Sequence, residues 1–189
     1  MVEEVDREKR EVRHASGLLG WVALWLVVLA AAKAPLAYAD DNVGAKIDVI
    51  ELRQSDESLR ATYAKGKRML LPRLLLLNAQ GRALLVEVGA RGGVGERLAA
   101  ALAKQKPLDT PISLDLALTE VVNSDGKPVV AADLPKADGY VVDYWAQWCA
   151  PCRELARDVE SQLKRWQGKH VVWLKIESDP EKLPEKNKH

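Results

Sequence analysis

The sequence predicts an α/β fold preceded by an apolar export segment. Two observations carry this prediction: strand-like apolar runs alternate with helix-like segments after residue 45, and an isolated apolar run lies near the N-terminus. Alternation of this kind is typical of a sheet covered by helices. The 189 residues suit one ordinary domain with extensions, and 48% apolar residues are enough for a core. The formal net charge of +1, without a basic tract, argues against a nucleic-acid partner.

Residues 1–39 form the predicted export segment. A charged stretch precedes the apolar run 17–32, which is shorter than the roughly 20 residues of a membrane-spanning helix. Ala37-Tyr38-Ala39 then supplies an A-x-A cleavage pattern. A cleaved signal peptide is therefore favoured over an uncleaved membrane anchor, and a buried core helix is the third alternative. In either export interpretation the residues after 40 lie outside the cytoplasm, as in a periplasmic protein.

The rest of the chain can be divided into elements by its apolar patterning and its turn residues. Ser55 is a candidate N-cap, and Gly168 is placed to end a helix. Residues 181–189 form a charged tail. The expected elements in chain order are a strand 46–52, a helix 55–65, a hairpin of strands 74–77 and 83–88, a helix 96–104, a segment 114–122 ambiguous between helix and strand, a strand 140–145, a helix from the cysteines to about 166 and a strand 170–176.

The chain contains only two cysteines, Cys149 and Cys152. Exported proteins often use cysteines as structural staples, but closing so small a loop gains little stability. The two cysteines are therefore expected either to take part in a reaction or to bind a metal. A zinc site needs more ligands, and His14, His170 and His189 are not at ligand spacing. The sequence thus favours redox chemistry by the Cys149–Cys152 disulfide itself, with no metal and no other cofactor.

The position of the pair, between a predicted strand and a predicted helix, has a chemical logic. A cysteine at a helix N-terminus is stabilised as the thiolate by unpaired N–H groups and by the helix dipole. Pro151 suits the first helical turn, because its missing N–H costs nothing there. Cys149 is therefore expected to be the exposed nucleophile, and Cys152, further into the helix, the thiol that resolves a mixed disulfide.

Residues 141–152, Val-Val-Asp-Tyr-Trp-Ala-Gln-Trp-Cys-Ala-Pro-Cys, resemble the strand and active-site turn of the thioredoxin family. The resemblance implies that Asp143 is the buried carboxylate that exchanges protons with the resolving thiol. It also implies that Trp145 and Trp148 shape the site, and that Trp148, Ala150 and Pro151 contact the substrate. The plainer alternatives are a solvated acid for Asp143 and core packing for the tryptophans. Arg157 departs from the family, which usually has a helix-kinking proline there.

In this chain, the segment that resembles the family's second half precedes the segment that resembles its first half. Residues 45–105 resemble the family's third strand, helix, cis-proline approach, hairpin and last helix, whereas 112–180 supply the cysteine half. The resemblance then implies that Leu71 and a cis Pro72 face the cysteines and bind substrate, the alternative being an ordinary trans proline. Because both 46–52 and 170–176 look like the third strand, one of them could add an edge strand. Alternatively, two chains could exchange halves in a swapped homodimer, or 45–105 could be a separate half-domain.

The resemblance predicts an enzyme, a circularly permuted thioredoxin-like thiol–disulfide oxidoreductase. Its substrates would be disulfides of exported proteins, and Ala-Pro between the cysteines resembles reducing members more than strong oxidants. The expected role is thus that of reductant or isomerase, which requires a membrane electron donor as a partner. The alternative is a non-catalytic assembly or chaperone module of a cell-envelope complex.

Overall fold

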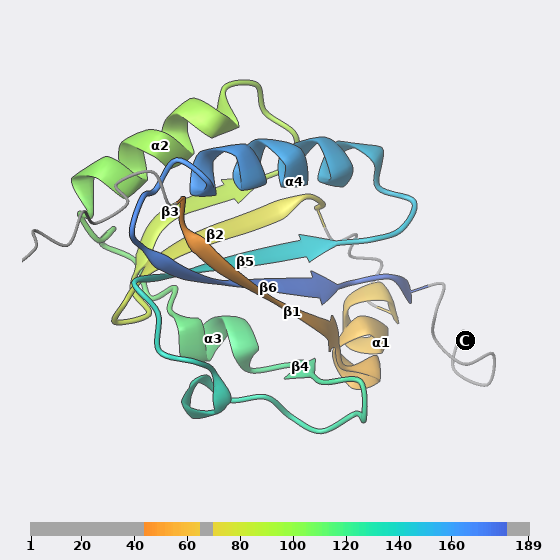
Figure 1. Cartoon of the computed structure of the whole chain (residues 1–189). Coiled ribbons are helices and arrows are strands. Elements are labelled where there is room, and N and C mark those ends of the chain that lie inside the picture. Colours follow the sequence, from red (N-terminus) through yellow and green to blue (C-terminus); the bar gives the residue numbers. More distant parts are fainter. Residues whose placement is uncertain (1–43, 65–69, 181–189) are drawn as a thin grey trace, which may run out of the picture. The chain divides into compact units, whose positions relative to one another are not determined.

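A computed structural model describes residues 44–64 and 70–180 (Figure 1). The predicted export segment 1–39 and the charged tail 181–189 lie outside these residues, so both stay predictions. None of the helices in the described ranges has the length and apolar content needed to cross a membrane.

One six-stranded sheet organises the described residues, with the strand order β3-β2-β5-β6-β1-β4. The central strands β5 and β6 are parallel, and β1 continues the sheet in parallel beside β6. β2 and β3 form an antiparallel hairpin on the other side of β5. The strands are β1 (Lys46–Gln54), β2 (Arg73–Asn78), β3 (Ala83–Val88), β4 (Val121–Val122), β5 (Gly139–Trp145) and β6 (His170–Glu177).

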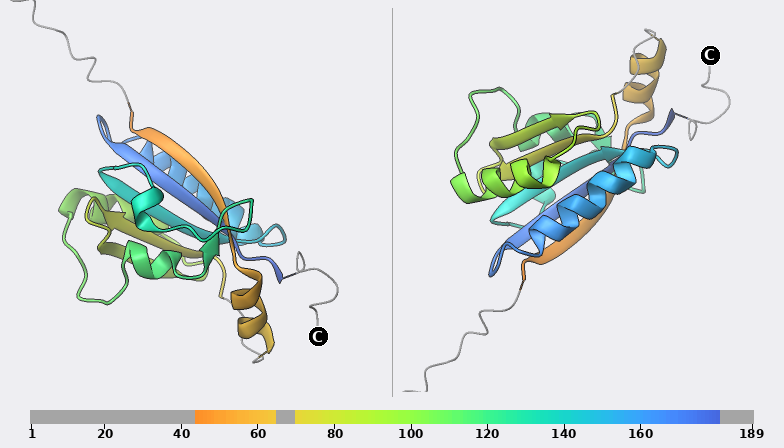
Figure 2. Two further views of the ribbon diagram at one scale, coloured as in Figure 1. Left: turned by 90° about the horizontal axis from the view of Figure 1, so that it is seen from below. Right: turned by 90° about the horizontal axis from the view of Figure 1, so that it is seen from above.

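Helices cover the two faces of the sheet unequally. Figure 1 shows α2 (Val94–Lys104) and α4 (Ala150–Leu163) side by side on one face, and α2 and α4 contact each other. The short α3 (Leu114–Leu118) and the 3-10 helix η1 (Ala131–Asp133) lie on the opposite face, an arrangement that the views in Figure 2 also show. Helix α1 (Asp56–Ala64) follows the end of β1. The sheet therefore separates two apolar clusters, one under each set of helices.

The apolar run of β2 shows why this sheet needs both layers. Leu74, Leu75, Leu76 and Leu77 are all completely buried. Because side chains alternate along a strand, Leu74 and Leu76 pack in the cluster under α2 and α4, whereas Leu75 and Leu77 pack in the cluster under α3. The sequence of a strand that is buried on both faces is apolar at every position, without alternation.

The α/β fold class and the order of expected elements agree with the structure. The Ser55 hydroxyl accepts a hydrogen bond from the Ser58 N–H at 3.2 Å, as an N-cap does. The ambiguous segment 114–122 contains both alternatives, helix α3 followed by the two residues of β4. Gly168 has a φ of 66°, but α4 ends at Leu163, earlier than the sequence suggested, and turns occupy the residues between.

The two candidates for the third strand both join the sheet. β6 lies next to β5, and β1 lies outside β6 in parallel register, with Ile50 opposite Leu174. β4 pairs with the outer side of β1 only at Arg53 and Gln54, so the rest of β1 forms an edge of the sheet, as one of the expected alternatives had it. Strands from 45–105 and from 112–180 share one sheet within one chain, so the idea of a separate half-domain is wrong. Circular permutation and a swapped homodimer stay predictions.

Candidate active site

Cys149 and Cys152 form a disulfide at the point where β5 gives way to α4. The S–S distance is 2.03 Å and the Cα–Cα distance is 5.3 Å. Cys149 is the N-cap of α4, and its sulfur accepts a hydrogen bond from the Cys152 N–H at 3.2 Å. Pro151 lies in the first turn of the helix. In the reduced protein, the same N–H and the helix N-terminus would favour a thiolate on Cys149.

The prediction that Cys149 is exposed is wrong for this disulfide form. Cys149 is 3% exposed and Cys152 is 2% exposed, so the two are buried alike. The physical reason is a small apolar cluster formed by the cysteines with Ala146, against which Leu71 and Trp145 pack. Ala150 and Pro151 between the cysteines are exposed, so solvent reaches the turn that carries the pair.

The loop before β2 brings Leu71 and Pro72 to the cysteines from far upstream in the chain. The Leu71–Pro72 peptide bond is cis, and the Pro72 carbonyl accepts a hydrogen bond from the Gly89 N–H at 2.7 Å. Leu71 packs against the cysteine cluster. β2 then runs antiparallel to β5, with Arg73 opposite Tyr144. This pairing of strands is what places the proline loop beside the cysteine turn.

A groove of about 220 Å³ lies between this proline loop and the start of α4. Pro72 and Pro151 line its two sides, and residues 89–94 close it. Glu154 and Asp158 add two carboxylates from α4, and Arg91 adds a cation. Residues 89–94, which connect β3 to the first residue of α2, therefore also contribute to a groove beside the disulfide.

Asp143 lies on β5, buried in the sheet at 1% exposure. Burial raises its pKa from 3.8 to about 7, and the positive charge of Lys175 partly opposes that effect. Lys175 is directly opposite on the parallel strand β6. Within the described residues, Asp143 Oδ1 has no hydrogen-bond partner. A carboxyl with a pKa near neutrality, on the strand that leads to the cysteines, is suited to proton transfer.

Two tryptophans flank the cysteine turn in different ways. Trp148 is 53% exposed, and its indole N–H donates a hydrogen bond to Asp179 at 3.2 Å. Trp145 is half-buried against the cysteines, and the Lys175 ammonium lies 5.4 Å from the centroid of its ring. Trp148 therefore offers an apolar surface beside the pair, whereas Trp145 supports the pair from inside.

Asp179 and Lys175 were not found by sequence reasoning. Both belong to β6 or the turn that follows it, and β6 is the parallel neighbour of β5. The carboxyl ends of parallel neighbours meet at one edge of a sheet, and here the Ser178 N–H donates to the Trp145 carbonyl at 2.7 Å. Because Asp179 follows the end of β6, which lies beside the end of β5, its position in the sequence could have identified it as a residue near the cysteines.

A metal centre is not visible in the part of the chain that the structure describes, since no three His, Cys, Asp or Glu side chains gather there. The cysteine pair of the site is joined as a disulfide.

Comparison with known proteins agrees with this geometry. The family model described as Thioredoxin matches residues 126–188. The chain is 43% identical over 54 residues to a thioredoxin of Pseudomonas aeruginosa, which covers 28% of this chain and 50% of that protein. It is 37% identical over 65 residues to a thioredoxin of Rickettsia bellii (31% of this chain, 51% of that protein), and 44% identical over 46 residues to one of Buchnera aphidicola (24% and 43%).

The chain thus spans about half the length of the curated relatives it matches. No solved structure gives a significant match. The matched segment contains β5, the cysteine turn, α4 and β6, so sequence similarity and geometry point to the same residues. Residues 126–188 are therefore similar to the thioredoxin family, over the segment that carries the cysteine pair.

Proposed function

We propose that this protein is a thiol–disulfide oxidoreductase that acts on the disulfides of exported proteins, as a reductant or isomerase. The observation that carries the proposal is the Cys149–Cys152 disulfide at the N-terminus of α4, with the cis Leu71–Pro72 loop against it. The predicted export segment 1–39 supports the location of the substrates outside the cytoplasm.

The reaction begins from the reduced pair. The Cys149 thiolate attacks one sulfur of a substrate disulfide, so that a mixed disulfide forms and one substrate thiolate leaves. Cys152 then loses its proton and attacks the Cys149 sulfur, which releases the second substrate thiolate. The released thiolates take up protons, so two electrons and two protons pass to the substrate. The enzyme is left with the Cys149–Cys152 disulfide, the form seen in the structure.

Three groups assist these steps in our proposal. Asp143, with a pKa raised to about 7 by burial, takes the proton from Cys152. Trp148 and the loop of Leu71 and Pro72 bind the substrate chain on either side of the sulfur under attack. A dithiol electron donor in the membrane, the partner that the sequence implies, returns the pair to the reduced state.

Insulin reduction by dithiothreitol tests the proposed activity, with the turbidity of the released B chain as the readout. We expect the wild-type chain to shorten the lag and raise the rate well above those of dithiothreitol alone, because the pair relays electrons to the insulin disulfides. A rate equal to that of dithiothreitol alone would contradict the proposal.

A further inference from the structure

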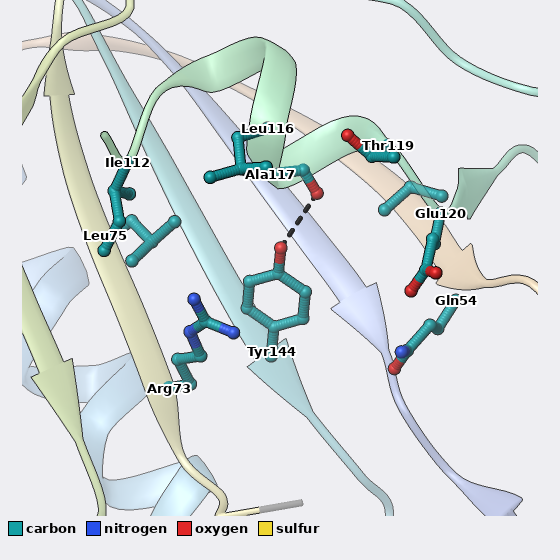
Figure 3. Close-up of a pocket in the computed structure, with 10 residues that line it drawn as sticks. Gln54, Arg73, Leu75, Ile112, Leu116, Ala117, Thr119, Glu120 and Tyr144 are labelled. Atoms are coloured by element: carbon teal, nitrogen blue, oxygen red, sulfur yellow. Dashed lines mark hydrogen bonds between the residues drawn. The ribbon is translucent and has the colours of Figure 1, made fainter. Parts of the chain in front are cut away.

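A second pocket lies on the face of the sheet opposite α4, away from the proposed substrate groove. Its volume is about 390 Å³, which falls in the range of roughly 300–1,000 Å³ typical of small-ligand sites. Leu75 and Tyr144 contribute from the sheet, and Ile112, Leu116 and Ala117 come from α3 and the segment before it (Figure 3). The Tyr144 hydroxyl is already occupied, because it donates to the Ala117 carbonyl at 2.8 Å.

At one end of this pocket, Gln54 has an unused acceptor. Gln54 is 6% exposed, and its Nε2 donates to the Ser58 hydroxyl at 2.7 Å. Its Oε1 is buried and has no hydrogen-bond partner within residues 44–64 and 70–180. A buried acceptor without a partner is costly, and a ligand N–H would satisfy it. Glu120 lies at the same end and accepts a hydrogen bond from Ser58, so this end of the pocket also disfavours an anion.

At the other end, Arg73 supplies a positive charge. Arg73 is half-buried, and its guanidinium lies 5.3 Å from the centroid of the Tyr144 ring. It takes part in none of the ion pairs found among the described residues. Figure 3 shows Arg73 and Gln54 on opposite sides of Tyr144. A guanidinium beside an apolar wall matches a carboxylate attached to an apolar body.

We propose that this pocket binds the C-terminal end of a peptide with an apolar last side chain. The terminal carboxylate pairs with Arg73, the last side chain packs against Leu75, Ile112 and Leu116, and a backbone amide N–H further from the terminus donates to Gln54 Oε1. The site uses neither cysteine, so it goes beyond the proposed oxidoreductase activity.

Isothermal titration of the full chain with N-acetyl-Ala-Ala-Leu, compared with the same peptide ending in an amide, tests this site. We expect the acid to bind and the amide to bind about tenfold more weakly or not at all, because the amide gives Arg73 no charge to pair with. Equal affinities for acid and amide, or no binding of the acid, would overturn the proposal whatever the variants show.

Variants locate the binding. Arg73→Gln should weaken binding of the acid about tenfold, Arg73→Lys less, and Gln54→Leu severalfold. Arg82→Gln, which removes an exposed arginine from the turn of the β2–β3 hairpin, is the matched control and should leave the affinity unchanged. Trp148→Ala should also leave the affinity unchanged.

If Trp148→Ala removes binding and Arg73→Gln does not, the peptide binds beside the cysteines and the proposal is wrong. Because this experiment measures peptide binding, a failure of the pocket proposal can be told apart from a failure of the insulin-reduction test.

Discussion

A Cys149→Ser variant is expected to lose the reduction of insulin entirely, to the rate of dithiothreitol alone. The fall in turnover should be on the order of a thousandfold or more, as is usual when a catalytic nucleophile is removed. The reason is chemical, because a serine hydroxyl at neutral pH neither ionises as a thiol does nor forms a disulfide with the substrate. Cys149 is the residue whose sulfur accepts the Cys152 N–H at the N-terminus of α4, where a thiolate is stabilised.

The control for this variant is Arg157→Gln. Arg157 is an exposed residue of α4, so its replacement should leave the rate close to that of the wild type. Far-ultraviolet circular dichroism should show that both variants keep the fold, since opening a loop of this size changes stability little. If Cys149→Ser reduces insulin at the wild-type rate, the proposal that the protein is a thiol–disulfide oxidoreductase is contradicted. That result would favour a non-catalytic assembly or chaperone module instead.

An Asp143→Asn variant is expected to be more stable than the wild type at pH 8 and equally stable near pH 4. The Asp143 pKa is raised from 3.8 in the unfolded chain to about 7 in the folded protein, chiefly by burial. Well below pH 3.8 the carboxyl is protonated in both states and costs nothing, and near pH 4 the cost is still small. As the pH rises towards 7, only the unfolded chain releases the proton, so the folded state loses stability, by roughly 4 kcal/mol in total.

Urea unfolding at pH 4, 6 and 8 measures this difference. The gain in the free energy of unfolding for Asp143→Asn should be near zero at pH 4, intermediate at pH 6 and largest at pH 8. Asp125→Asn, in the exposed turn between β4 and η1, is the matched control and should show no such trend. A gain that does not change with pH would show that Asp143 ionises in the folded protein as readily as in the unfolded chain.

Much of the fold was predictable because its signals are local. The apolar run of β2, the Ser55 cap and the strand before the cysteines each depend on a few neighbouring residues, and each appears where it was expected. The cysteine turn was predictable for the same reason. The approach of Leu71 to the cysteines came from the family resemblance alone, since nothing local links segments so far apart in the chain.

The remaining features depend on how strands are placed in the sheet. Lys175 opposes Asp143 only because β6 pairs with β5 in one particular register. Gln54 and Arg73 share a pocket only because β1 and β2 lie on opposite sides of the central pair of strands. The burial of Cys149 was mispredicted because it depends on packing by Leu71 and Trp145, which a helix-terminus argument does not include.

The most direct test of the central claim is to trap the reaction halfway with a Cys152→Ser variant. This variant keeps Cys149 as its only thiol, so a substrate attacked by Cys149 stays attached. Incubation of the reduced variant with insulin should give a mixed disulfide through Cys149, seen by mass spectrometry and released by dithiothreitol, whereas Cys149→Ser should give little adduct. A folded Cys152→Ser variant that forms no adduct, or one that forms no more than Cys149→Ser does, would contradict the assignment of Cys149 as the nucleophile.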